Sequence, residues 1–105
     1  MECTTLTSVH IPESVTSIGD FAFATCPSLT SINIPEGVTY IGQSTFHSCT
    51  SLTSISSLNT VAPSLNVSAF SNIPTNGTLH IKPGATGYDK WLSKLPSGWT
   101  IVEDL

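Results

Sequence analysis

Three cysteines have the widest choice of chemistry in this sequence, and they recur at intervals of 23 residues, at Cys3, Cys26 and Cys49. Thiolates bind metals and pair as disulfides. If each cysteine opens one rung of a stacked sheet, neighbouring rungs lie about 4.8 Å apart. That spacing falls within the range of about 4.4–6.8 Å between Cα atoms joined by a disulfide. An odd number leaves one thiol over, so we favour a column of buried thiols that pack as small apolar side chains.

The three histidines are the other metal-binding candidates. His10 and His80 share the outward position of their strands, but three rungs separate them, a distance of about 14 Å. Two imidazoles that share a metal need bonds near about 2 Å. His47 follows Phe46 on the opposite arc of the coil. We therefore predict surface histidines, with no metal site and no cofactor.

Serine is abundant, but a catalytic serine needs a base and a carboxylate that orients the base. The three aspartates are Asp20, Asp89 and Asp104, which we place in a turn, in a short helix and near the C-terminus. Neither a G-x-S-x-G nucleophile motif nor a glycine-rich phosphate loop occurs. Glu13 and Glu36 share one repeat position, at a solvated corner where like charges repel. We predict that the protein is not an enzyme.

The spacing of the cysteines belongs to a repeat of the whole sequence. Residues 3–25 and 26–48 are identical at twelve of 23 aligned positions. A fixed period of 20 to 30 residues is typical of solenoids, in which one short coil stacks on the next. The sequence therefore predicts a solenoid, mainly β, with short turns.

The second unit shows how one coil is built. Ile32 and Ile34 alternate with Asn33, which is the spacing of a strand with one face buried. Pro35 has no N–H to donate, so it ends the strand. For Gly42 we predict a backbone conformation that other residues avoid. The inward positions of this unit are then Leu29, Ile32, Ile34, Val38, Ile41 and Phe46.

The third unit, residues 49–72, is degenerate, because Ser57-Leu58-Asn59 replaces the Ile-Pro-Glu step. Ala69-Phe70 returns one place late, which indicates a one-residue insertion. With the register reset, Ile73 takes the cysteine position. A fourth strand is then expected at 78–81, after the Asn76-Gly77 turn.

The last part of the chain, residues 73–105, contains that fourth rung and a cap. Residues 88–95 carry an apolar stripe at i, i+3, i+4 and i+7, which predicts a short helix over about 87–95. The stripe consists of Tyr88, Trp91, Leu92 and Leu95. Trp99 and Ile101 then predict a closing strand. The open end of a solenoid needs such a cover for its last apolar rung.

Composition limits the partners of the protein. Charged residues make up 10% of the chain, with three Lys and Arg against seven Asp and Glu. Binding to nucleic acid or to an anionic membrane requires many cations, so we predict neither partner. No run of 18 apolar residues occurs, so we expect no membrane insertion.

At this point the residues resemble a known family. The motif L-T-S-I-x-I-P-E-x-V-T-x-I-G, followed by A-F or T-F and then C-x-S-L, is similar to the BspA-like leucine-rich repeat. The resemblance implies a leucine-rich-repeat solenoid that winds as a right-handed superhelix, with one C-terminal capping helix. It also implies a surface or secreted protein of a Bacteroides-type bacterium, in a family whose members include adhesins and which shares no catalytic residues.

The outward face of the predicted strands is the candidate binding surface. Its two columns are Ser8, Ser31, Ser54, Thr78 and His10, Asn33, Ser56, His80. Solenoids commonly bind through the surface of their stacked strands. The columns lack the Trp, Tyr and Arg of tight protein interfaces. They are therefore either a solubilising ladder of hydroxyls or a site for weak, multivalent contact with a glycan or peptide. Tyr40 is a further exposed candidate.

From these features we predict a non-catalytic adhesion or recognition module of an extracellular or cell-surface protein, which binds a host or microbial protein or glycan. The alternatives are a structural spacer or end-cap, and an accessory domain of a secreted enzyme. We expect residues 1–105 to form one domain of a longer protein, with no leader in this sequence. The first rung, with Leu6, Val9 and Ile11, has no rung before it and is a template for association. Three arrangements are open: further repeats of a longer protein stack there, two copies self-associate end to end, or the edge stays exposed.

Overall fold

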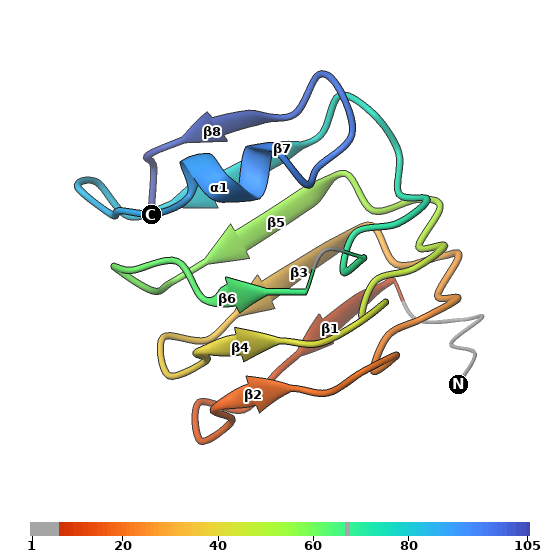
Figure 1. Cartoon of the computed structure of the whole chain (residues 1–105), viewed down its shortest axis with the longest axis horizontal. Coiled ribbons are helices and arrows are strands. Elements are labelled where there is room, and N and C mark those ends of the chain that lie inside the picture. The colour runs from red at the N-terminus through yellow and green to blue at the C-terminus, as the bar shows by residue number, and fades with distance from the viewer. Residues whose placement is uncertain (1–6, 67) are drawn as a thin grey trace.

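The computed structural model describes residues 7–66 and 68–105, and within these it leaves the side chain of His10 undescribed. Its framework is a five-stranded parallel sheet in the order β1-β3-β5-β7-β8. Figure 1 shows these strands stacked one above another. Their bounds are β1 Ser8–His10, β3 Ser31–Ile34, β5 Ser54–Ser57, β7 Thr78–Ile81 and β8 Thr100–Val102.

A second, three-stranded parallel sheet forms the other side of each coil. Its strands are β2 Ser17–Ile18, β4 Tyr40–Ile41 and β6 Ser64–Leu65. They run opposite to β1, β3 and β5, because the chain turns back after each long strand (Figure 1). This arrangement confirms the predicted solenoid of mainly β structure.

The strand register locates the insertion in the third unit. Ser57 pairs with Ile34, 23 positions earlier, whereas Ser64 pairs with Tyr40, 24 positions earlier. The extra residue therefore lies between Ser57 and Ser64, in the loop that joins β5 to β6. The prediction of a fourth strand is confirmed, because β7 covers residues 78–81 and pairs with β5.

Columns of like side chains fill the interior. The rings of Phe23, Phe46 and Phe70 stack with centroids 5.8 and 5.6 Å apart, and Trp91 of the cap continues the column at 5.7 Å. Aromatic pairs in this range contribute about 0.5–1.5 kcal/mol each beyond their burial. The ladder therefore ties all three units to the cap.

Two of the three cysteines lie in the described part of the chain. Cys26 and Cys49 are both fully buried, as expected for small apolar filler. The thiol of Cys49 lies 3.0 Å from the carbonyl oxygen of Phe23, one coil earlier. Cys3 lies outside the described residues, so a column of three thiols stays a prediction.

We expected glycine at position 42 because of a backbone conformation that other residues avoid, and that reason was wrong. Gly42 does not have a positive φ; in the described part of the chain the left-handed positions of this arc are Phe21, Thr25, Ser44 and Ser48. A Cβ on Gly42 would instead lie 2.4 Å from Oδ1 of Asp20. Glycine is present because the backbones of two coils approach closely there.

The capping helix α1 spans Asp89–Leu92, a single turn that is shorter than the predicted 87–95. Trp91 and Leu95 are buried as expected, but Leu92 is 39% exposed, so its place in the apolar stripe was wrong. After α1 the chain makes one further turn, in which the N–H groups of Lys94 and Leu95 donate to the carbonyl of Trp91 at 2.9 and 3.0 Å. The predicted closing strand is confirmed as β8, parallel to β7.

Candidate functional site

The structure places the eight predicted face residues in two columns across the five-stranded sheet. Ser8, Ser31, Ser54 and Thr78 are successive register partners, and Thr100 of β8 extends the column. The second column runs through His10, Asn33, Ser56 and His80 and ends at Val102. Adjacent positions lie one strand apart, about 4.8 Å. The geometry assembles the surface, while its role in binding stays a prediction.

The far end of the second column carries a contact that the sequence did not suggest. Nδ1 of His80 lies 2.9 and 3.0 Å from the two carboxylate oxygens of Asp104. The C-terminal tail returns to the end of β7, where the N–H of Leu105 donates to the carbonyl of Ile81 at 3.2 Å. The face is therefore polar and uncharged over its first coils and gains a carboxylate at its last. No periodic signal marks residues 103–105, so this pairing could not be read from the repeat.

A groove crosses the opposite side of the molecule at the β5–β6 loop. Residues 60–62 pair with the segment that leads to the cap, because Ala62 donates to the carbonyl of Thr86 at 2.9 Å and Thr86 donates to that of Thr60 at 2.9 Å. This pairing opens a hollow on each side of the loop, of about 360 and 410 Å³. The inserted residue therefore creates a groove that the regular coils lack.

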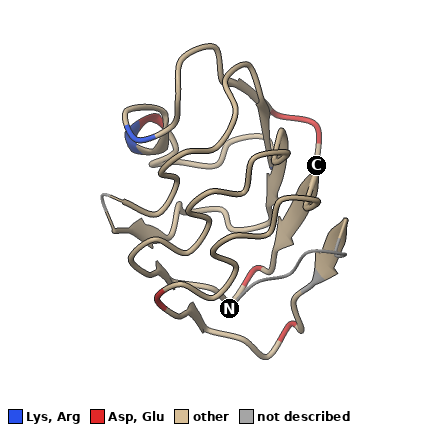
Figure 2. Cartoon of the chain, turned by 90° about the vertical axis from the view of Figure 1, so that its right-hand side faces the viewer, with Lys and Arg blue, Asp and Glu red and all other residues tan. Residues whose placement is uncertain are grey.

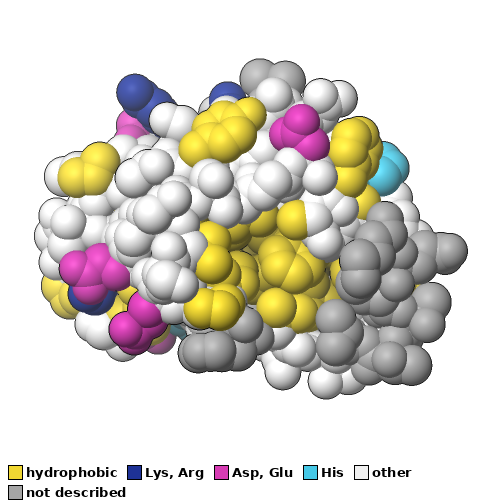
Figure 3. Space-filling model, turned by 90° about the horizontal axis from the view of Figure 1, so that it is seen from below, with side chains coloured by type: hydrophobic (Ala, Val, Ile, Leu, Met, Phe, Trp, Pro, Cys, Tyr) yellow, Lys and Arg dark blue, Asp and Glu magenta, His cyan; other side chains and the backbone are white. Residues whose placement is uncertain are grey.

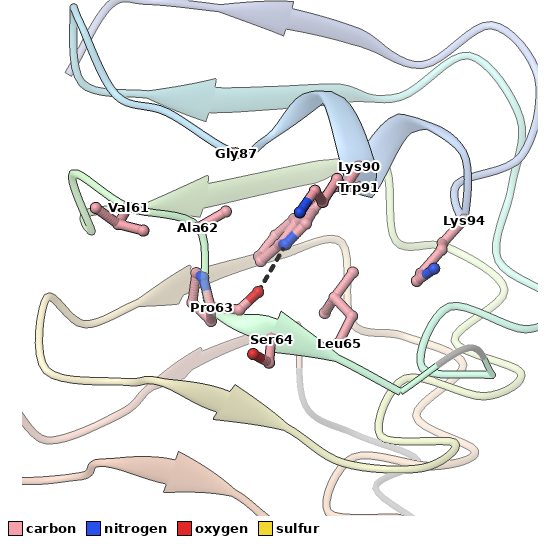
Figure 4. Close-up of a pocket in the computed structure, with 9 residues that line it drawn as sticks. All are labelled: Val61, Ala62, Pro63, Ser64, Leu65, Gly87, Lys90, Trp91 and Lys94. Atoms are coloured by element: carbon pink, nitrogen blue, oxygen red, sulfur yellow. Dashed lines mark hydrogen bonds between the residues drawn. The ribbon is translucent and has the colours of Figure 1, made fainter.

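Figure 4 shows the hollow on the cap side. Trp91 forms its back wall and donates its indole N–H to the carbonyl of Pro63 at 3.0 Å. Ser64 and Leu65 lie below it, and the side chains of Lys90 and Lys94 flank it from the cap. The site combines two ammonium groups, one exposed hydroxyl and an apolar wall. The broken repeat at 57–59 was the only sequence signal for it.

Buried polar groups hold the β5–β6 loop in this position. The hydroxyl of Tyr88 lies 2.7 Å from Oγ of Ser57 and donates to the carbonyl of Asn59 at 2.9 Å. Burial raises the pKa of the Tyr88 hydroxyl, and the hydrogen bond with Ser57 partly opposes that shift. The amide of Asn59 donates to the carbonyl of Val38, one coil earlier. The loop is therefore fastened both to the cap and to the second unit.

A family model described as a BspA type leucine-rich repeat region matches residues 1–87 in six copies. The chain belongs to this family. No curated protein and no solved structure matches the chain. Within the described residues, no helix is long and apolar enough to cross a membrane. The BspA-type assignment identifies a repeat-protein module, and the function of such a module depends on its surface side chains.

One BspA-type surface cluster has the residue types of a catalytic triad. Ser56 neighbours His80 in the register, and His80 contacts Asp104. A nucleophilic serine requires a hydrogen bond to its base. Among the described residues, no hydrogen bond joins Ser56 to His80, whose Nδ1 contacts the carboxylate of Asp104. In the described structure these three residues therefore lack the serine–histidine hydrogen bond of a triad.

Metal binding is not favoured either. Across residues 7–66 and 68–105, no three His, Cys, Asp or Glu side chains lie close enough to hold a metal ion. His80 is engaged by a single carboxylate, and its column neighbour Ser56 is a poor ligand for soft metals. What the BspA-type scaffold offers is two polar surfaces, the strand face and the groove beside the cap.

Proposed function

We propose that this BspA-type module is a non-catalytic adhesion or recognition domain of an extracellular or cell-surface protein, and that its ligand is a protein or glycan bound on the strand face. The observation that carries the proposal is the pair of straight polar columns on the five-stranded sheet. A parallel stack repeats the same hydrogen-bonding groups at a constant interval of about 4.8 Å. Such a surface suits an extended ligand that makes the same contact several times.

The side chains of the columns favour a hydroxyl-rich ligand. Serine and threonine hydroxyls and the amide of Asn33 both donate and accept hydrogen bonds, as sugar hydroxyls do. Asn33 is exposed, while Ser31, Ser54 and Ser56 are half-buried between their neighbours. Each contact is individually weak, because it replaces a hydrogen bond to water and gains about 1 kcal/mol. Useful affinity then requires contacts on several coils at once.

A labelled sample of the chain, applied to an array of glycans and extracellular matrix proteins, tests the proposal. We expect binding to extended polar ligands that grows with ligand length. The double variant Asn33→Ala, Ser56→Ala removes two neighbouring groups of one column and should lose most of that binding. The matched control Ser14→Ala, Thr60→Ala removes two exposed hydroxyls away from the sheet and should bind as the parent does.

If the chain binds nothing on the array, the recognition role is overturned and the alternative role of a structural spacer is favoured. Equal loss in the face variant and in the control would show that binding does not use the columns. If binding instead disappears in Lys90→Gln, Lys94→Gln, the ligand occupies the groove beside the cap, and the proposed face is wrong. The extracellular location is tested separately, by labelling intact cells of the source organism with an antibody to the chain.

A further inference from the structure

The N-terminal end of the solenoid is an open apolar surface. Figure 3 shows hydrophobic side chains gathered in a hollow at this end. The hollow has a volume of about 250 Å³. It is lined by Val9, Ile11, Pro12, Val15, Ser17, Ile18, Gly19, Ala22 and Phe23. Contiguous apolar surface of this kind on a protein otherwise rich in exposed hydroxyls indicates a contact site.

Comparison with the second coil shows what this end lacks. Val38 and Phe46 are fully buried because a coil covers them, whereas their first-coil equivalents Val15 and Phe23 are only half-buried. The apolar surface also continues outward to Phe21, which is 50% exposed. One further layer of protein would bury these positions.

The two ends of the same sheet are suited to each other. β1 and β8 are the edge strands of one parallel sheet (Figure 1). A second copy shifted along the stack would bring its β8 beside β1 with the same strand direction, so the sheet would continue. In the cap at the β8 end, Leu92 is an exposed apolar side chain, at 39%.

A two-fold pair of N-terminal ends is less suitable. In the first coil, Phe21 and Phe23 donate their N–H groups to the second coil, to the carbonyls of Gln43 and Thr45 at 2.9 Å each. The carbonyls equivalent to those acceptors belong to residues 20 and 22 and, by the repeat, face the open end. Two such ends placed together would oppose carbonyl rows, while a copy stacked in the same direction would not.

Charge favours the same direction of stacking. Residues 7–66 contain Glu13, Asp20 and Glu36 and no Lys or Arg, whereas all three lysines follow residue 81. Figure 2 shows acidic residues alone on the lower coils, and both lysines and acidic residues at the upper end. Two N-terminal ends would bring acid against acid. Head-to-tail stacking instead places the acidic end beside a cap in which three lysines offset Asp89, Glu103 and Asp104, so the repulsion is smaller.

We propose that copies of this chain associate head to tail, with the cap end of one copy seated on the apolar N-terminal end of the next. The contact is heterologous and does not close on itself, so association is open-ended. Head-to-tail stacking also continues the two polar columns of the strand face, because Thr100 of one copy would lie beside Ser8 of the next. The strand face stays uncovered, so association and ligand binding are tested separately.

Sedimentation velocity of the full chain, from micromolar to millimolar concentration, tests the proposal. We expect the average mass to rise beyond that of a dimer without a plateau. Ala22→Arg places a bulky cation in the hollow and should leave the chain monomeric at every concentration. Thr50→Arg makes the same charge change at an exposed corner of a middle coil and should associate as the parent does. Lys90→Gln, Lys94→Gln leaves the cap end acidic and should weaken association about fivefold.

Phe21→Ser is a second test that does not depend on the folding of Ala22→Arg. Serine is compatible with this position, because the equivalent residue of the second coil is Ser44. This variant should keep its melting temperature at low concentration and associate more weakly than the parent. A plateau at twice the monomer mass would mean a closed two-fold pair and would overturn head-to-tail stacking. A parent chain that stays monomeric at millimolar concentration would overturn the proposal altogether, and the N-terminal end would then be a place for a further coil of a longer chain.

Discussion

The hydroxyl of Tyr88 fastens the cap to the broken third repeat, and Tyr88→Phe removes that hydroxyl alone. Tyr88 is 2% exposed and Ser57 is fully buried. The hydroxyl group lies 2.7 Å from Oγ of Ser57 and 2.9 Å from the carbonyl of Asn59. After the substitution, Oγ of Ser57 has lost the partner that the structure shows for it. The ring itself still packs against Trp91 at a centroid distance of 5.0 Å.

The cost follows from these contacts. A buried hydrogen bond contributes about 1 kcal/mol net, and a buried polar group left without a partner costs about 1–3 kcal/mol. We expect Tyr88→Phe to lower the free energy of unfolding by about 2 kcal/mol. For a domain of this size the melting temperature should fall by about 10 °C. Ser57→Ala should cost less, because Tyr88 then keeps its bond to the carbonyl of Asn59.

Urea unfolding of the two single variants and the double variant measures the coupling directly. The double variant should be about 1 kcal/mol more stable than the sum of the single effects, because no hydroxyl is then left orphaned. Strict additivity would show that the two hydroxyls do not stabilise each other. A loss below about 0.5 kcal/mol for Tyr88→Phe would mean that water replaces the phenol, and the cap would not depend on this bond.

The pKa of Tyr88 adds a pH dependence with a definite sign. Burial raises this pKa above its ordinary value of 10.0, so the folded state holds the phenolic proton more tightly than the unfolded chain. The contribution of Tyr88 is complete below that ordinary value and declines as the pH rises past it. Stability of the parent should therefore fall more steeply above about pH 10 than that of Tyr88→Phe. Parallel curves in alkaline urea titrations would refute the assignment.

Three further predictions concern single positions. Gly42→Ala should destabilise the fold by about 2 kcal/mol, because its Cβ would lie 2.8 Å from the backbone nitrogen of Asp20. Gly19→Ala, with nothing within 4 Å of its Cβ, is the control, and equal urea midpoints for the two would contradict the close approach. Phe21→Asn should stabilise the folded state by about 1 kcal/mol at low protein concentration, since asparagine tolerates the φ of 58° at this position better than phenylalanine. A melting temperature below that of the parent would contradict backbone strain at this position. Asp104→Asn should lower the free energy of unfolding by only about 0.5 kcal/mol, because the side chain of Asp104 is 48% exposed. A loss above about 2 kcal/mol in urea unfolding would show that the C-terminal tail is structurally essential.

The regular part of this fold could be predicted because each coil repeats the same local requirement. An inward residue recurs at each strand position, so the register of Ile32 with Ile55 and Leu79 follows from alignment of the units alone. The β7 strand could be placed for the same reason, once the one-residue insertion was recognised. The two polar columns follow automatically, since outward residues alternate with the inward ones.

Contacts made once in the molecule could not be predicted in this way. The return of the tail to His80, and the pairing of Val61 with Thr86, join segments that no period relates. The length of α1 was also beyond the sequence pattern, because an apolar stripe records which residues face inward and not how many turns the helix completes. The groove beside the cap depends on the Val61–Thr86 pairing, so it was missed together with that contact.

The broken third repeat and the cap are therefore matched to each other. Ser57 stands in the column where Ile34 and Ile81 stand in the neighbouring coils, and a serine there would leave space and an unpaired hydroxyl. The phenol of Tyr88 supplies a partner for that hydroxyl and volume beside it. An isoleucine at position 57 would complete the column but would confront the Tyr88 hydroxyl with an apolar side chain. The serine that breaks the repeat is thus the residue that ties this cap to the stack, and the insertion that follows it in the same loop opens the groove.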